Sequence, residues 1–315
     1  MPETRRLRVQ PDPGCQLLVI VAVVLLASTF TGIDALDTGA LNSAPSIHAE
    51  NTRAQRGLRA NIKWHSHSRA KFVDVVVVAP SAAGWQDRRA RIREQFPRNL
   101  KLMNSSRSAT LNFALGTRNI SETAVAALEA EQGEHQDMLL LDCIDMDDDL
   151  NWNWNWKLDG DVSATTSKVM LSIAWAVQHY KFHYFFRLGD DSYFRVDKFV
   201  ELFDTHQIPR EKAVVGQILK ADILGMSQEY PQGMGYGLTY DLCSFVSTAM
   251  PWLLDTAPED GVVARWLFAT GAKFINSSAW RSIIDGEKCD SDMVLAHKLP
   301  PEKWPDISAL GTVEC

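Results

Sequence analysis

The sequence has no excess of basic residues: its 315 residues include 32 Lys and Arg against 39 Asp and Glu, for a formal net charge of -7. A nucleic-acid-binding domain normally carries a basic face, so this balance argues against a nucleic acid as partner. Cysteine is scarce, at five residues, and no close group of Cys and His has the spacing of a zinc site. The hydrophobic content of 46% is enough for one large core or two modest ones.

The beginning of the chain differs from the rest because it carries a long apolar stretch. Three arginines within residues 5–8 precede a nearly uncharged segment over 14–30, close to the roughly 17 residues that a helix needs to cross a bilayer. Flanking arginines favour a cytoplasmic N-terminus. The pattern predicts a cytoplasmic tail over 1–13, a signal-anchor helix over 14–33 and a single-pass type II membrane protein. A cleaved signal peptide is the alternative, and either one places the body of the protein in the secretory pathway.

Two further features agree with that compartment. Asn-X-Ser sequons at Asn104, Asn119 and Asn276 are acceptor sites for N-glycosylation. The cysteines outside the apolar stretch are even in number, which in an oxidising compartment permits two disulfides with three possible connectivities. These cysteines are Cys143, Cys243, Cys289 and Cys315.

The body of the chain alternates between strand-like and helix-like segments. Apolar runs predict strands over 72–78, 111–115, 138–141, 184–188 and 213–216, and amphipathic patterns predict helices over 86–96, 121–132 and 163–180. Pro97 is expected to stop the first helix, and Ser121 to cap the second. This alternation predicts an α/β fold with a mostly parallel, twisted sheet that is flanked by helices.

Two segments fall outside this pattern. Residues 34–70 are rich in small and polar residues and are expected to form an exposed stem, which leaves one lumenal domain over 71–315. An Asn-Trp repeat over 151–156 is expected to be a surface insertion that folds back onto the domain. Aromatic repeats without convergent polar groups do not specify a binding site.

The predicted strand at 184–188 is followed by Gly189, Asp190 and Asp191, and then by a helical pattern. In an α/β protein, ligands bind at the C-terminal ends of the strands. Two adjacent carboxylates at such a point suit a hard divalent cation, which in turn holds phosphate oxygens. A solvated turn is the alternative interpretation, because Asp is a common turn residue.

Short motifs along the body occur in the same order as in one known family. They are an arginine-rich helix at 89–96, Phe-x-x-Gly at 113–116, a Glu-containing block at 131–139, a helix with Lys and Trp at 167–176, Gly189-Asp190-Asp191, a Tyr-Pro and Gly-x-Gly-Tyr segment at 230–236, an acidic pair at 259–260 and a His segment at 296–302. Together they resemble the β-1,3-galactosyltransferase family, glycosyltransferase family 31. The resemblance runs from about Val75 to His297, which is most of the body.

The resemblance implies a role for each motif residue. Asp191 and His297 are similar to the metal ligands of the family, and their mixed oxygen and nitrogen donors suit Mn²⁺. Asp260 resembles its general base, and Glu259 would position that base or bind the acceptor. The residues implied to bind the donor are Arg89, Arg93, Asp190, Gly233, Gly235 and Tyr236.

The resemblance also implies a GT-A-like fold, a location in the Golgi membrane and inverting transfer of a hexose. The hexose, galactose, would pass from a UDP-sugar donor to a hydroxyl of a glycan on a glycoprotein or glycolipid, in β-1,3 linkage. Two alternatives stay open. The same machinery could use UDP-N-acetylglucosamine, or the protein could be an inactive lumenal glycan-binding protein, because Gly189 replaces the first carboxylate of the family's Asp-Asp-Asp motif.

Overall fold

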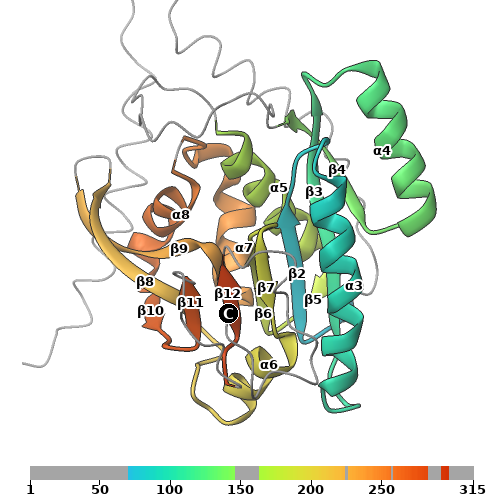
Figure 1. Ribbon diagram of the computed structural model, residues 1–315. Helices are drawn as coiled ribbons and strands as arrows, with labels where there is room; N and C mark the ends of the chain where they lie inside the picture. The colour runs from blue at the N-terminus through green and yellow to red at the C-terminus, as the bar shows by residue number, and fades with distance from the viewer. Residues whose placement is uncertain (1–69, 146–162, 224–225, 257, 283–291, 298–315) are drawn as a thin grey trace, which may run out of the picture. The chain divides into compact units, whose positions relative to one another are not determined.

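The computed structural model describes residues 70–145, 163–223, 226–256, 258–282 and 292–297 (Figure 1). The predicted tail and signal anchor, nearly all of the stem and the Asn-Trp repeat lie outside the described residues. Within the described part of the chain, no helix is both long enough and apolar enough to cross a membrane.

A seven-stranded sheet forms the centre of the described domain, in the order β10-β8-β9-β6-β2-β3-β4. Strands β6, β2, β3 and β4 are parallel, β9 is antiparallel to both β6 and β8, and β10 is parallel to β8. Their bounds are β2 Val75–Pro80, β3 Ala109–Arg118, β4 Met138–Ile144, β6 Tyr184–Leu188, β8 Ala213–Ile223, β9 Met226–Thr239 and β10 Lys273–Asn276. The α/β class is therefore confirmed, as a mixed sheet in which a parallel half adjoins an antiparallel hairpin.

Helices cover both faces of this sheet (Figure 1). One core includes side chains of α3 Gln86–Leu102, α4 Glu122–His135 and α6 Val196–Asp204, and the other includes side chains of α5 Ala164–His179, α7 Tyr240–Ala249 and α8 Glu259–Leu267. Strand β2 shows how one segment serves both cores. Val75 and Val77 belong to the first core, and Val76 and Val78 to the second, because successive side chains of a strand point to opposite faces.

A small second sheet brings the end of the described chain beside the acidic turn that follows β6. It consists of β11 Trp280–Ser282, β12 Leu295–His297 and β7 Ser192–Phe194, in that order. Strand β12 is antiparallel to β7, with His297 opposite Ser192. The remaining elements are the paired strands β1 Lys71–Phe72 and β5 Tyr180–Lys181, and two 3-10 helices, η2 Met250–Trp252 and η3 Phe268–Thr270.

The predicted strands and helices are present, but one detail of the prediction is wrong, and one strand was not predicted. Ser121 does cap α4, because its hydroxyl accepts a hydrogen bond from the Ala124 N–H at 3.2 Å. Pro97 does not stop α3, which continues to Leu102, since Asn99 in the following turn is buried and donates to the Phe194 carbonyl at 2.7 Å. The helix expected after Asp191 is present as α6, and the unpredicted strand β7 lies before it because that segment pairs with the distant β12.

The cysteines differ from the sequence-based expectation. Among the described residues, Cys143 and Cys243 are buried free thiols, so at most one of the two permitted disulfides can form. Its cysteines, Cys289 and Cys315, lie outside the described residues. Burial raises the pKa of Cys143 to about 11, and it also raises that of Cys243. The three sequon asparagines are exposed, as glycosylation requires.

Candidate active site

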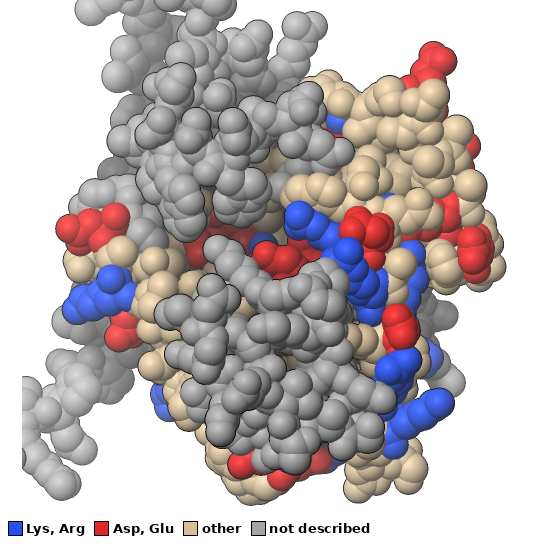
Figure 2. Space-filling model, viewed as in Figure 1, with Lys and Arg blue, Asp and Glu red and all other residues tan. Residues whose placement is uncertain are grey.

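The two adjacent carboxylates lie in the turn between β6 and β7, at the C-terminal end of the parallel half of the sheet. Asp190 turns inward and is 8% exposed, and it accepts hydrogen bonds from Ser81 Oγ and Arg88 Nη1, both at 3.2 Å. Burial raises the pKa of Asp190 to about 6, although the charge of Arg88 opposes the shift. Acidic and basic side chains lie close together near the middle of the face shown in Figure 2. Asp190 thus ties the turn after β6 to the loop after β2.

Asp191 meets His297, which is far away in the sequence. The carboxylate Oδ2 lies 3.3 Å from His297 Nε2, because the pairing of β7 with β12 places His297 opposite the residue after Asp191. Burial acts to raise the pKa of Asp191, but the hydrogen bond and charge of His297 outweigh it, and the net shift is downward. The two residues predicted from the motifs as metal ligands are therefore neighbours.

This pair offers one carboxylate and one imidazole to a cation. The His297 Nδ1 is buried and has no hydrogen-bond partner among the described residues. Those residues contain no group of three or more His, Cys, Asp or Glu side chains that could hold a metal ion. An ion bound here would need further ligands besides these two side chains, such as phosphate oxygens or water.

Gly189, where the family's motif has a carboxylate, is packed tightly against β9. Its N–H donates to the Met234 carbonyl at 3.0 Å. An added Cβ would lie 2.8 Å from that carbonyl oxygen and 2.8 Å from Ser192 Oγ. A side chain at this position would therefore displace the β9 backbone, so the close packing of β9 is matched to the absence of the carboxylate.

Asp260 lies in the first turn of α8, with both of its oxygens held by backbone groups. Oδ2 accepts from the Gly233 N–H at 2.9 Å, and Oδ1 accepts from the Gly261 N–H at 2.8 Å. Burial raises the pKa of this carboxyl, while the hydrogen bond from Gly261 and the charge of Arg187 oppose the shift. Asp260 is thus a fixed carboxylate that is more basic than an exposed one.

Glu259 is more deeply buried than Asp260, and protein groups occupy its carboxylate. Arg187 lies 3.2 Å from it, and the Tyr236 hydroxyl donates to it. Burial raises the pKa of Glu259 and of Tyr236, and the Arg187 charge opposes both shifts. Glu259 therefore anchors the start of α8 to the sheet.

Strand β9 connects the two acidic pairs. Gly233 donates its N–H to Asp260, while the carbonyl of the next residue, Met234, accepts from Gly189 and from Ser192 Oγ. The carbonyl of Gly235 accepts a hydrogen bond from Trp280 Nε1 at 2.9 Å. A Cβ atom added to Gly235 would collide with the side chain of Leu295. The glycines predicted to bind the donor thus also allow β9 to approach its neighbours.

Arg89 and Arg93, which were predicted to bind the donor, both pair with Glu131. Arg89 is fully buried, lies 2.6 Å from Glu131 and donates to the Ala82 carbonyl in the loop after β2. Arg93 lies 2.7 Å from Glu131 and 2.8 Å from Asp137. These contacts show that both arginines hold α3, α4 and the loop together, and their contact with a donor stays a prediction.

Removing Glu131 should therefore destabilise the domain strongly. Glu131→Ala leaves the buried Arg89 without its acidic partner, and breaking a buried pair in this way typically lowers the free energy of unfolding by about 3–5 kcal/mol. Urea unfolding would measure the change. Asp87→Ala is the matched control, since it breaks the exposed Arg91–Asp87 pair on α3, the helix that also carries Arg89. It should lower the free energy of unfolding by less than about 1 kcal/mol. Equal midpoints for the two variants would contradict this role of the pair.

Sequence reasoning assigned no role to two charged groups that organise the site, one of which, Lys168, belongs to the motif with Lys and Trp. Lys168 is fully buried, donates to the Ser81 carbonyl at 2.7 Å and pairs with Asp145, which accepts from the Ala83 N–H at 2.7 Å. Arg187 is the other group, and it stands in a strand that is otherwise apolar. A charge within a buried strand requires a partner, and this was the available signal.

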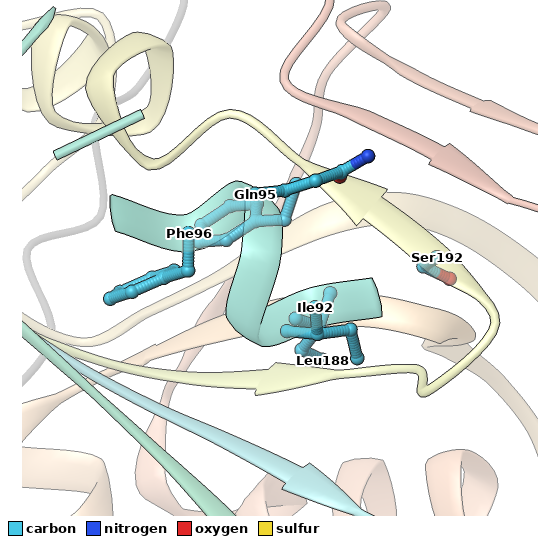
Figure 3. A pocket seen from close by; sticks show the side chains of 6 residues that line it. Ile92, Gln95, Phe96, Leu188 and Ser192 are labelled. Atoms are coloured by element: carbon cyan, nitrogen blue, oxygen red, sulfur yellow. The ribbon is translucent and has the colours of Figure 1, made fainter. Parts of the chain in front are cut away.

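A small pocket adjoins the acidic turn (Figure 3). It has a cavity volume of about 10 Å³, which is room for about one water molecule. It lies between α3 and the β6–β7 turn and is lined by Ile92, Gln95, Phe96, Leu188, Ser192 and Phe194. A sugar nucleotide does not fit in it, so the carboxylates and loops outside it form the candidate site.

No family model matches the chain. Over 265 residues the chain is 22% identical to mouse Beta-1,3-galactosyltransferase 6, with 79% of this chain and 76% of that protein covered. The chain is similar to a galactosyltransferase. This distant similarity supports a glycosyltransferase as the class of enzyme, in line with the acidic site at the C-terminal ends of the strands.

Proposed function

We propose that the protein is an inverting glycosyltransferase with a GT-A-like fold, which transfers galactose from a UDP-sugar to a glycan hydroxyl in β-1,3 linkage. The observation that carries the proposal is the meeting of Asp191 and His297 at 3.3 Å, in a site that β9 connects to Asp260. The similarity to a galactosyltransferase over most of the chain gives independent support.

Asp191 and His297 fit a divalent cation. Their carboxylate oxygen and imidazole nitrogen suit Mn²⁺, and the buried Nδ1 of His297 is without a partner in the described structure. When bound, the ion would stabilise the negative charge that develops on the departing diphosphate. Asp190 lies next to this pair, where Ser81 and Arg88 hold its carboxylate.

Asp260 acts as the general base in the proposed mechanism. It accepts the proton of the acceptor hydroxyl while the acceptor oxygen bonds to the anomeric carbon and the bond to UDP breaks. A single displacement of this kind converts an α-linked donor into a β-linked product. The N–H groups of Gly233 and Gly261 orient the carboxylate, and Glu259 positions the helix turn through Arg187 and Tyr236.

The test is a donor screen on the purified full-length protein with Mn²⁺. Release of UDP from UDP-galactose, slow alone and faster with a glycan acceptor, is the expected result. Preference for UDP-N-acetylglucosamine would support a glycosyltransferase but would show that the donor sugar is not galactose. If folded protein releases no UDP from either donor but binds glycans, it is a glycan-binding protein and the proposal fails.

We further propose that the protein is a single-pass type II protein of the Golgi membrane. The apolar segment over 14–30, with arginines before it, supports this topology. Protease added to intact microsomes should then spare the residues beyond the anchor, and endoglycosidase should increase the electrophoretic mobility. Digestion of the whole body in sealed vesicles would contradict the topology.

A further inference from the structure

The positively charged side chains around the candidate site differ in whether they form ion pairs and hydrogen bonds with other protein groups. Lys168 pairs with Asp145, and Arg187 pairs with Glu259 and donates to the Gly233 carbonyl. Arg89 and Arg93 share Glu131. All of these contacts lie within the protein, so these cations already have partners.

Arg88 is held less firmly. Its side chain is 36% exposed, and among the described residues its acidic partner is Asp190, at 3.2 Å through Nη1. The guanidinium carbon Cζ lies over the ring of Trp85, 4.0 Å from its centroid, in a cation–π contact. A guanidinium has five N–H donors. Several of these have no acceptor within the described structure and can bind a ligand.

Arg88 is also at the place where the proposed donor needs a cation. Its partner Asp190 is adjacent in sequence to Asp191, so the guanidinium reaches the same turn as the proposed metal pair. The diphosphate of a UDP-sugar is anionic, yet Asp190, Asp191, Glu259 and Asp260 make this edge of the sheet rich in acids. The planar guanidinium matches phosphate oxygens in geometry and charge.

We infer that Arg88, held against Trp85, binds a phosphate group of the nucleotide donor. This inference rests on the proposed function and adds a residue outside the motif at 89–96, in which Arg89 and Arg93 are the arginines with an implied role in donor binding. Arg88 is accordingly a donor-binding residue, and Trp85 is a positioning residue that acts through it. Binding of the phosphate draws the guanidinium into a contact shared with Asp190.

Calorimetric titration of the full-length protein with UDP, and separately with uridine, tests this assignment in the presence of Mn²⁺. Arg88→Ala should weaken UDP binding by about 10- to 100-fold, as expected for a hydrogen bond to a charged group. Its affinity for uridine, which lacks phosphate, should stay at the wild-type value. Arg88→Lys keeps the charge without the planar fork and should show a smaller loss for UDP, also without a change for uridine.

Arg91→Ala is the matched control. Arg91 is on the same helix and is 38% exposed, close to the value for Arg88, but its partner is the exposed Asp87. This variant should bind UDP as the wild type does. Trp85→Ala should weaken UDP binding less than Arg88→Ala does, because the charge remains.

Wild-type UDP affinity in Arg88→Ala and Arg88→Lys would overturn the inference and leave the proposed function intact. Equal losses for UDP and uridine would also overturn it, because Arg88 would then support the shape of the site instead of contacting phosphate. Wild-type protein that binds no UDP would overturn the proposed function, and this inference with it.

Discussion

Replacing Asp260 by asparagine is expected to lower turnover by about 10²–10⁴-fold, which is the usual contribution of a general base. The amide keeps the shape of the side chain, and its oxygen can still accept from the Gly233 N–H, but its NH2 group loses the hydrogen bond from the Gly261 N–H and cannot take up the acceptor proton. UDP release under saturating donor and acceptor measures the effect. Binding of UDP with Mn²⁺ should be nearly unchanged, because other residues form that part of the site.

The pH dependence provides a second check on the same residue. Burial raises the pKa of Asp260, and a base must be ionised to act. Activity should therefore fall as the pH drops through this raised pKa, at a higher pH than an ordinary Asp would give. The acid limb should disappear from the residual activity of Asp260→Asn. Wild-type turnover in this variant would show that Asp260 only begins the helix, a role worth about 0.3–1 kcal/mol.

Glu259→Gln serves as the comparison for Asp260→Asn. The amide keeps the size of the side chain but weakens the ion pair with Arg187. Because Glu259 is assigned to positioning, it should affect turnover less than Asp260→Asn does and lower the midpoint of thermal unfolding more. The reverse order would exchange the roles of the two acids.

Replacing Asp191 by alanine should abolish most of the metal-dependent activity. Lewis-acid stabilisation by a bound ion is worth several kcal/mol, and each 1.36 kcal/mol is a factor of ten in rate. A loss of about 10²-fold or more is therefore expected, with a higher Mn²⁺ concentration needed for half of the remaining activity. A chelator should abolish the activity of the wild-type protein, and added Mn²⁺ should restore that activity.

Folding controls separate this effect from instability. The Asp191 side chain is 41% exposed, so its removal should leave the free energy of unfolding within about 1 kcal/mol of the wild-type value. Asp87→Ala, at an exposed position on α3, should keep both full activity and the normal requirement for Mn²⁺. Full activity of the chelated wild type would refute the metal assignment.

The local parts of the fold were predictable because they depend on neighbouring residues. The valine run of β2 is apolar at every position, as a strand buried on both faces requires, and Ser121 is a good helix cap at the position where α4 begins. Pro97 misled because the contact that keeps the last turns of α3 in place, between Asn99 and Phe194, joins distant segments. Strand β7 was missed for the same reason, since its partner is β12.

The residues of the candidate site could be predicted where a sequence motif includes them. They could not be predicted where the role of a side chain depends on whether the fold buries or exposes it. The motifs singled out Asp191 and His297, which lie 3.3 Å apart in the structure, and their role as metal ligands stays a prediction. They also singled out Arg89 and Arg93, whose burial against Glu131 depends on how α3 and α4 pack. The neighbouring Arg88 looks the same in the sequence, and only the fold shows that it is partly exposed and reaches Asp190.

Consecutive residues of β9 bind Asp260 and the two neighbours of the acidic turn, Gly189 and Ser192, and this limits how β9 can change in length. An insertion between Gly233 and Met234 would turn the following side chains to the opposite face of the sheet, and the contact with Asp260 could not form together with the contact to Gly189. Residues 226–231 pair with β8 and not with β6 in the described structure. Within that stretch the buried Gln228 donates to the Gly261 carbonyl at 2.8 Å, beside Asp260. Changes in length between Gln228 and the end of β9 at Met226 should therefore preserve the spacing between the base and the metal pair, whereas a deletion that removes Gln228 should loosen the start of α8.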